Sequence, residues 1–595
     1  MTKYNNIFEF IIAQENSMML PSSVIENWEW SFREHVRLTV LYKNSQFDTG
    51  KSDDKPFKNI IRPILNLQYR AEGFDVKDIV FYVNDKENYY KSFLVKKKFE
   101  KWARENHLDT FIDELVESYV DFGGVLVKKL QGVRPEIVPL QSIAFCDQTD
   151  ILSGPLAIKH FLSPDQFRDM EKKGWGKEEN GATATIDDVI LLSENQKIND
   201  KNTGQQNQTP GKYIEAYEVH GTMPKRFFDD GDSDDYITQM QIVCFYINKD
   251  GKRQGLILFR KEVKTDLFKF LARDKVYGRA LGFGGAEELF EPQVWTNYGM
   301  IKKKHMLDGA GIIYQTSDTA YANRNKIKDM DNREITVVEE GKRIEQINTT
   351  PVNIALFDNA VREWEDHAKM MGSANEAILG ESPSAGTPFK LQELVAAESH
   401  SLHEYRKGKI ATFVEEILRD WTIGHFVKEI TKGDEFLVNL DADELMSIAK
   451  QISQNTVNKR IKEQILNGEI PDADALAVQT EQAEFLKKGN KRFIQILEGE
   501  LKNIPLDIEI NIVGKQKYLA SMTDKIVNIV RQAIATPQIW NDPRFTKLFN
   551  QILEYSGLSP MEIDFQPMQM QPSQATQPLG ELVQPQKNVT EMATA

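Results

Sequence analysis

The chain has 595 residues, which is too long for one hydrophobic core, so we expect several substructures. It carries 74 Lys and Arg against 89 Asp and Glu, and this net charge of −15 argues against a protein that grips nucleic acid tightly through neutralised phosphates. No apolar run approaches the roughly 18 residues of a membrane span, and the first residues lack the basic start and apolar block of a signal peptide, so we expect a cytosolic protein with no membrane contact.

Residues 1–150 predict mixed α/β structure. A helix through Phe111 and Tyr119 should end at Gly123-Gly124, because glycine is the usual residue just past a helix, and a strand should follow at Val125–Lys128. The two cysteines of the chain, Cys146 and Cys244, lie in apolar, strand-like contexts. We interpret both as buried free thiols of a reducing compartment.

The next region predicts an antiparallel sheet after a polar segment. Residues 175–212 contain polar, glycine-rich stretches that suggest mobile loops extending from the fold. Tyr213–His220 and Ile237–Ile247 are strand-like, and Lys249–Lys252 supplies a turn into Leu256–Arg260. An Asp-Gly turn between two apolar runs is the strongest short signal for a hairpin.

A helix should begin at Glu291-Pro292 and run past Met306. Lys302, Lys303 and Lys304 lie in its last turns, where cations favour the helix dipole. These lysines could face a polyanion, but the spacing favours a solvated helix end. A small β insertion follows, with strands predicted at Ile312–Gln315, Ile335–Val338 and Arg343–Ile347.

Two long helices joined by a Gly/Ser/Pro loop form the most informative stretch. Six residues of the first helix recur at spacings of three and four and so share one narrow seam. They are Ile354, Phe357, Val361, Trp364, Ala368 and Met371. The loop Gly380–Lys390 cannot continue this helix, and Thr387 and Pro388 suit the cap and first turn of a new one. The seam of the second helix contains Ile410, Phe413, Val414, Ile417, Leu418 and Trp421.

The C-terminal part predicts a strand, then helices, then disorder. Leu506, Ile508, Ile510 and Ile512 alternate with polar residues, as in a half-buried strand. Two amphipathic helices should follow within residues 523–558, and the Gln/Pro-rich residues 566–595 should be disordered.

Sequence motifs for catalysis are missing. There is no Gly-x-x-x-x-Gly-Lys-Ser/Thr phosphate loop, no His-Glu-x-x-His and no paired cysteine motif. The glycines at Gly282, Gly284 and Gly285 lack dinucleotide spacing and suggest a turn before a helix. Asp230-x-Asp232 resembles a calcium loop but lacks its glycine and its last glutamate. We therefore expect no enzyme, no catalytic residue, no cofactor and no metal.

The order and lengths of these parts resemble the portal proteins of tailed bacteriophages. Four cues carry the resemblance over roughly residues 55–560: Asn59–Asn66, Tyr119–Pro139, Tyr277–Asn297, and the series of helix, β insertion, helix, loop and long helix. It is an analogy at the level of the fold. It implies an α+β, mainly helical portal fold that assembles as a ring.

The resemblance also implies a division of the chain. The parts are a wing (1–285), stem helix 1 (286–310), a clip (311–351), stem helix 2 (352–379), a tunnel loop (380–390), a long wing helix (391–430), the C-terminal wing (431–515), a crown (516–562) and a disordered tail (563–595). Pro292–Leu307 and Asn353–Ile378 would be the stem helices that line the channel.

Candidate site residues follow from the same resemblance. The DNA-facing tunnel loop would be Gly380, Glu381, Ser382, Pro383, Ser384, Ala385, Gly386, Thr387, Pro388, Phe389 and Lys390. The channel-facing stem residues would be Lys302, Lys303, Lys304, Trp364 and Met371. The clip residues that contact the motor or the adaptor would be Arg324, Lys326, Lys328, Arg333, Lys342 and Arg343.

The implied function is a channel at one capsid vertex for packaging, retention and ejection of double-stranded DNA. The implied partners are copies of this chain in a ring, usually twelve, the packaging terminase, the tail adaptor, and the major capsid and scaffolding proteins. The implied location is the virion, with assembly in the host cytoplasm. An acidic channel suits a sliding DNA duplex, which carries about one charge per 1.7 Å.

Two other classes of protein stay open. The chain could be a non-catalytic scaffold of a DNA-processing complex, or another virion structural protein such as a minor head or tail component. Taken alone, Gly380–Lys390 could also be an ordinary surface connection between two helices.

Overall fold

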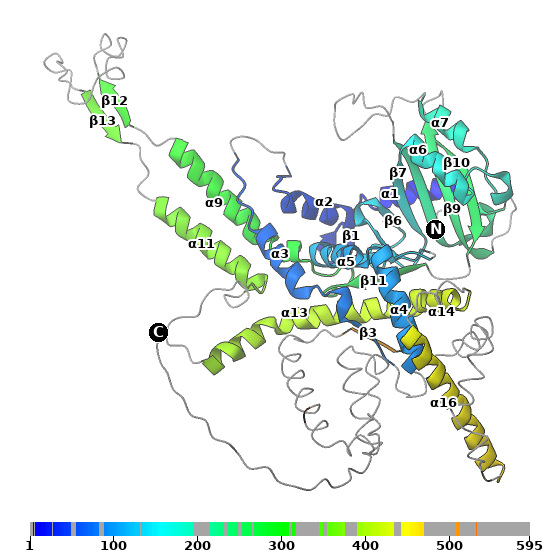
Figure 1. The fold of residues 1–595 in the computed structure, drawn as a ribbon. Helices are drawn as coiled ribbons and strands as arrows, with labels where there is room; N and C mark the ends of the chain where they lie inside the picture. Colours follow the sequence, from blue (N-terminus) through cyan, green and yellow to red (C-terminus); the bar gives the residue numbers. More distant parts are fainter. Residues whose placement is uncertain are drawn as a thin grey trace, which may run out of the picture.

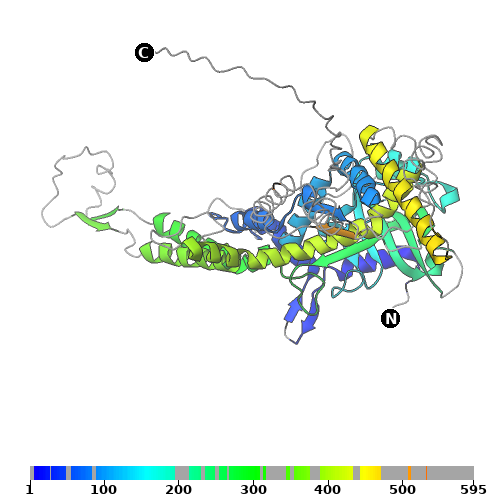
Figure 2. The same cartoon turned by 60° about the horizontal axis from the view of Figure 1, so that its bottom comes forward.

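The computed structural model describes most of the first 470 residues. The described residues are 4, 6–26, 28–48, 55–82, 89–130, 132–194, 213–229, 235–247, 253–263, 267–308, 312–316, 344–348, 354–374, 389–432, 442–468, 470, 507–510 and 531. They form a broad α/β body from which two helices extend side by side (Figures 1 and 2). The fold is mixed α and β, compatible with the predicted α+β class.

The body contains helices from both halves of the chain. The helices before the extension are α1 (Ile7–Ser17), α2 (Phe32–Lys43), α3 (Ile61–Glu72), α4 (Tyr89–Glu105), α5 (Leu108–Phe122), α6 (Pro164–Asp169), α7 (Ile186–Glu194) and α8 (Gly285–Glu288). The extension consists of α9 (Phe290–Asp308) and α11 (Ile354–Met371). The later helices are α13 (Phe389–Ile417), α14 (Ile423–Lys432) and α16 (Ala442–Leu466).

Five small sheets are described. The largest has the order β10-β9-β8-β7-β6, all antiparallel, and the next has the order β11-β4-β5. Their strands are β4 (Gly124–Lys128), β5 (Glu136–Val138), β6 (Ile143–Phe145), β7 (Leu156–Leu162), β8 (Ile214–Pro224), β9 (Tyr236–Ile247), β10 (Arg253–Glu262) and β11 (Phe268–Ala272). The two-stranded sheets pair β1 (Ser22–Ile25) with β2 (Trp28–Trp30), β3 (Ile79–Tyr82) with β14 (Asp507–Ile510), and β12 (Ile312–Thr316) with β13 (Ile344–Asn348).

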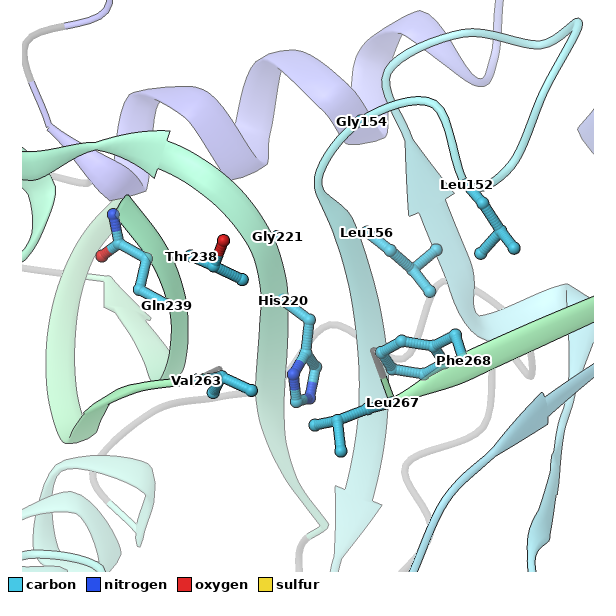
Figure 3. A pocket seen from close by; sticks show the side chains of 10 residues that line it. All are labelled: Leu152, Gly154, Leu156, His220, Gly221, Thr238, Gln239, Val263, Leu267 and Phe268. Carbon is cyan, nitrogen blue, oxygen red and sulfur yellow. The ribbon is translucent and has the colours of Figure 1, made fainter. Parts of the chain in front are cut away.

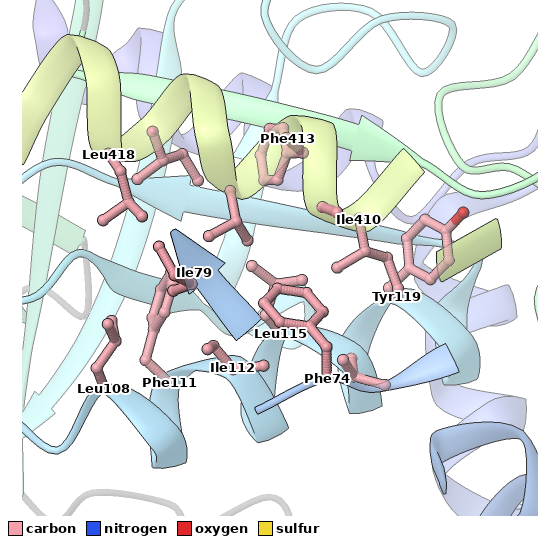
Figure 4. Close-up of a cluster of buried hydrophobic side chains, with 14 of the residues drawn as sticks. Phe74, Ile79, Leu108, Phe111, Ile112, Leu115, Tyr119, Ile410, Phe413 and Leu418 are labelled. Carbon is pink, nitrogen blue, oxygen red and sulfur yellow. The ribbon is translucent and has the colours of Figure 1, made fainter. Parts of the chain in front are cut away.

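The main core lies where α13 crosses α5 and β3. Figure 4 shows Ile410 and Phe413 of α13 above Ile79 of β3 and Leu115 of α5. The predicted seam of the long helix is therefore buried, with Trp421 at its edge, but it packs on the body of its own chain. Burial of these side chains holds α13 across the body.

Several predicted elements are confirmed. The helix predicted before Gly123 is α5, and Gly123 follows it with a left-handed φ of 75°. The strands on either side of the predicted Asp-Gly turn, β9 and β10, pair antiparallel as expected, and the turn residues 248–252 lie outside the described residues. The alternating run near Ile508 contributes β14, and Gly282–Gly284 lead directly into α8, which begins at Gly285. The predicted strand at 335–338, the Asp230–Asp234 segment and the helices expected within 523–558 lie outside the described residues, apart from Arg531.

Other predictions are corrected by the structure. Cys146 is exposed, because it follows β6 in a loop, while Cys244 is buried as predicted. Residues 175–194 do not form a mobile loop as predicted, because α7 and Trp175 pack against the large sheet through apolar side chains. The long helix predicted at 391–430 is interrupted by a π-helical turn at Leu418–Thr422, which accommodates one extra residue in the helix.

Of the two helices predicted to form a stem, the first ends at Asp308, close to the predicted Leu307, but the second ends earlier than predicted. The helix predicted to reach Ile378 stops at Met371, because Gly372 and Ser373 form a turn that caps it. The described part of α11 is thus 18 residues long, or about 27 Å at 1.5 Å per residue.

A substitution at Gly123 tests the close approach at the exit of α5. An added Cβ would lie 2.8 Å from the backbone nitrogen of Gly284 and closer still to the carbonyl of Gly282, and the φ of 75° is unfavourable for alanine. Gly123→Ala is expected to lower the free energy of unfolding by about 2–4 kcal/mol in chemical denaturation.

The control for this prediction is Gly408→Ala. Gly408 lies inside α13, and an added Cβ there meets nothing within 4 Å. That change should raise stability by about 0.5–1 kcal/mol. If the free energy of unfolding of Gly123→Ala fell by no more than that of Gly408→Ala changes, the close packing around Gly123 would be contradicted.

Candidate channel arm and its buried base

The two helices α9 and α11, which we call the arm, pack side by side along their length. Trp295 of α9 stacks on Trp364 of α11 with ring centroids 6.0 Å apart and an interplanar angle of 9°. Lys303 donates to Asp358 at 2.6 Å, and Gly299 allows close approach of the buried Val361. Of the seam predicted for α11, Val361 and Trp364 contact α9, Ala368 belongs to the main core of the body, and Met371 is exposed.

The inner end of the arm is tied to the body by two amide side chains. The Gln293 Oε1 atom accepts from the backbone N–H of Ile60 at 2.8 Å, and its Nε2 donates to the carbonyl of Lys58 at 2.7 Å. Asn297 Oδ1 accepts from the N–H of Lys58 at 3.1 Å and from Gln293 at 3.0 Å. Because both amides are buried, these bonds replace those that water would make and fix the direction of α9.

The arm keeps large apolar side chains in contact with solvent. Seven of them are exposed: Val294, Trp295, Tyr298, Leu307, Leu356, Met370 and Met371. The two most exposed, Leu356 at 64% and Met370 at 72%, both belong to α11. A face of this kind on a projecting element is typical of a protein interface.

A group of buried charges lies in the body beside the inner end of the arm and joins α3, α8 and α13. We call the group Glu72, Arg273, Asp274, Glu288, His403 and Arg406 the ion cluster. Arg273 is fully buried and donates to Glu72 at 2.8 Å, with Glu288 at 3.6 Å. Arg406 donates to Glu288 at 2.8 Å and to Asp274 at 2.6 Å. These residues come from α3, α8, α13 and the segment after β11, so the cluster links four parts of the chain.

The charges of the cluster stabilise one another. Burial by itself would raise the pKa of Glu72, but the hydrogen bond from His403 and the positive charge of Arg273 lower it below its ordinary value. Burial would likewise lower the pKa of Arg406, and the carboxylates of Glu288 and Glu72 outweigh it. Glu72 therefore stays ionised and acts only as a hydrogen-bond acceptor.

A second buried group joins the two larger sheets. Glu218 of β8 accepts from Lys128 of β4 at 2.6 Å, from His160 of β7 at 2.9 Å and from His220 at 2.7 Å. Burial opposes ionisation of Glu218, but the bonds from His160 and His220 and the charge of Lys128 hold its pKa well below the usual range.

His220 also borders a cavity of about 230 Å³ between the large sheet and Phe268 (Figure 3). The cavity is lined by Leu152, Gly154, Leu156, His220, Gly221, Thr238, Gln239, Val263, Leu267 and Phe268. None of these is a carboxylate or a thiol, and Gln239 donates to the carbonyls of Met223 and Pro224. The cavity shows no nucleophile paired with a base.

The predicted stem lysines take different positions. Lys303 is engaged with Asp358, Lys304 lies 3.9 Å from Asp308, and the ammonium of Lys302 lies 5.5 Å from the ring of Tyr298. Trp364 stacks on Trp295 and is partly buried, and Met371 is exposed at the end of α11.

The other predicted site residues are largely outside the description. Residues 380–388 of the predicted tunnel loop are not among the described residues. Phe389 and Lys390, which were also assigned to that loop, are instead the first described residues of α13, so the helix predicted from residue 391 includes them. The predicted clip residues, Arg324, Lys326, Lys328, Arg333, Lys342 and Arg343, also lie outside it. The β insertion itself is described only as β12 paired with β13 beyond the outer end of the arm (Figure 1).

Sequence reasoning missed the ion cluster. Arg273 and Glu72 are 201 residues apart, and neither belongs to a recognisable motif. The only signal in the sequence was a charged residue beside an apolar strand or at a helix end. Such residues are too common for this pattern to identify a buried cluster. His403 is likewise buried, between α13 and Glu72 of α3.

Among the described residues, no group of three or more His, Cys, Asp or Glu side chains is arranged to hold a metal ion. None of the helices in the described ranges combines the length and apolar content that crossing a membrane requires.

No protein-family model and no curated protein matches the chain. Among solved structures, it is similar to a chain of the "Neck of empty GTA particle computed with C6 symmetry". The TM-score is 0.34 and the sequence identity is 8%, over 78% of this chain and 99% of that chain. At these values the similarity supports no conclusion about function.

Proposed function

We propose that this chain is a viral portal protein, whose copies close into a ring at one capsid vertex through which genomic DNA is packaged, retained and ejected. The order of parts in the sequence supports the proposal. One observation carries it: the arm extends away from its own core and exposes seven large apolar side chains. The proposed location is the virion.

A neighbouring copy is the partner that best accounts for the exposed arm. Two helices can bury only the faces that they turn toward each other, so Tyr298 and Met370 remain open to solvent. Each such side chain contributes about 1.5–3 kcal/mol when fully buried. A contact between different faces of adjacent copies produces a ring when the rotation closes.

The charges of the arm are compatible with passing DNA. Its two helices contain five Lys or Arg and six Asp or Glu residues, a net charge of −1. Lys303 is paired with Asp358, and Lys369 lies 3.8 Å from Asp366. Since affinity for DNA grows with the number of neutralised phosphates, such a surface should let the duplex slide.

In this proposal Gly380–Lys390 faces the DNA, and the β insertion contacts the terminase and the tail adaptor.

The oligomeric state of the purified protein tests the proposal. We expect closed rings in negative-stain electron microscopy and one large species in analytical ultracentrifugation. The double variant Tyr298→Asp and Met370→Asp should give monomers or open fragments, with at least about a tenfold loss of rings, because each change places a charge in the interface. Circular dichroism should show an unchanged fold.

A matched control is Leu466→Asp at the end of α16. Leu466 is 85% exposed and is the last residue of α16, a helix that lies on the side of the body away from the arm (Figure 1). This variant should still form rings. A wild-type protein that remains a monomer at all concentrations and ionic strengths would contradict the proposal and favour another virion structural protein or a scaffold.

A further inference from the structure

The C-terminal end of α11 is held in a strained turn. The N–H of Ala374 donates to the carbonyl of Lys369 at 2.8 Å, and the N–H of Ser373 donates to that of Met370 at 3.2 Å. This is the Schellman pattern, in which glycine usually occupies the left-handed position. Here Ser373 occupies it with a φ of 52°. A non-glycine residue in this region marks strain that the surroundings must sustain.

Two buried side chains hold this turn from outside. Gln68 of α3 donates from Nε2 to the carbonyl of Gly372 at 3.1 Å. His403 of α13 lies with Nε2 3.4 Å from the carbonyl of Ser373 and Nδ1 3.1 Å from Glu72 Oε1. Both are almost fully buried, so water does not compete for these bonds.

The contacts of His403 require two protons. A carbonyl oxygen and an ionised carboxylate are both acceptors, so each ring nitrogen can bond only as a donor. The neutral ring has one N–H. Because Glu72 offers the shorter and charged contact, the neutral ring keeps its proton on Nδ1 and loses the bond to Ser373.

The charged groups around His403 come from every element packed against it. Arg273 and Arg406 disfavour a second proton on the ring, while Glu72, Glu288 and Asp274 favour it. Lys409 is 3.7 Å from Asp274 at the edge of the cluster. Burial raises the pKa of Tyr119 on α5, which keeps it neutral. On α11 itself, Lys369 is turned toward Asp366.

We propose that His403 is a proton-operated latch: with both ring nitrogens protonated it ties the end of α11 to α3, and loss of the Nε2 proton releases the turn Gly372–Ala374. The bond from His403 to Glu72 and the bond from Gln68 to the Gly372 carbonyl survive this loss, so α13 stays attached to α3 and only the Ser373 end of the turn is released. The latch is a property of a single chain and does not depend on ring assembly. It acts at the point where α11 ends and before α13 begins.

Hydrogen exchange of the full-length protein, read by mass spectrometry in peptides covering 365–374, tests the latch. After correction for intrinsic rates, protection of the turn should fall at least about fivefold between pH 5.5 and pH 8, the equivalent of one hydrogen bond. Peptides from α5 should show no such change. In His403→Gln, which cannot gain a proton, protection should not depend on pH.

Two further variants keep the test decisive if His403→Gln fails to fold. Ser373→Gly relieves the left-handed strain but keeps the carbonyl, so protection should rise at both pH values with the pH dependence intact. Gln68→Ala should lower protection at both and also keep the dependence. The latch is refuted if the wild-type turn shows the same protection at pH 5.5 and pH 8, or if His403→Gln retains the wild-type dependence.

Discussion

Replacing Arg273 with methionine is expected to lower the free energy of unfolding by about 3–5 kcal/mol, enough to prevent folding at 37 °C. Arg273 is fully buried and neutralises Glu72 and Glu288. Methionine fills similar space but leaves these carboxylates with one guanidinium fewer. A buried charge without its partner is far more costly than the pair is favourable. Urea denaturation followed by tryptophan fluorescence measures the loss.

The control for Arg273→Met is Arg37→Met. Arg37 also contacts two carboxylates, Glu34 and Asp48 at 2.6 Å, but its side chain is 43% exposed. Water screens such a pair, so the change should stay within about 1 kcal/mol. In the double variant Arg273→Met and Glu72→Met, part of the stability should return, since one unpaired charge is removed. Equal losses at Arg273 and Arg37 would show that the cluster is not desolvated.

Replacing Glu218 with glutamine should lower the free energy of unfolding by about 3 kcal/mol near neutral pH. Glutamine has nearly the same shape, but it leaves Lys128 buried between the two sheets without its counter-charge. It also accepts through only one oxygen, whereas Glu218 binds Lys128, His160 and His220 through two. Urea denaturation of both proteins across a pH series measures the difference.

The pH dependence of this difference has a definite sign. The pKa of Glu218 is held well below its ordinary value by His160, His220 and Lys128, against the effect of burial. Its stabilisation is therefore complete above the unfolded value of about 4.3 and is lost as the pH falls through the folded pKa. The gap between wild type and Glu218→Gln should be widest near neutrality and should narrow below about pH 4.

Glu215→Gln on the same strand is the matched control. Glu215 lies 3.1 Å from Lys159, but it is 40% exposed, so the change should cost less than about 1 kcal/mol. A gap for Glu218→Gln that stays constant down to pH 3 would show that the carboxylate is not selectively stabilised in the folded protein.

The sequence predicted the arm better than it predicted the arm's base. The spacing of Val361, Trp364 and Ala368 indicated a helix with one buried seam, and in α11 the first two contact α9 while Ala368 is buried in the main core. The end of α11 was misplaced because Gly372 inside a helical pattern is a weak stop signal, and the apolar residues beyond it, such as Ile378, suggested that the helix continued.

What the sequence determined by itself is local: helices and strands whose periodicity, glycines and turns act over a few residues, such as the stop of α5 at Gly123 and the hairpin between β9 and β10. What only the tertiary structure decided is which distant residues meet. Arg273 with Glu72, β14 with β3, and His403 with Ser373 each join segments that lie far apart in the chain. The physical reason is that a buried charge or an open strand edge must find a partner, but its own neighbours in sequence do not determine which one.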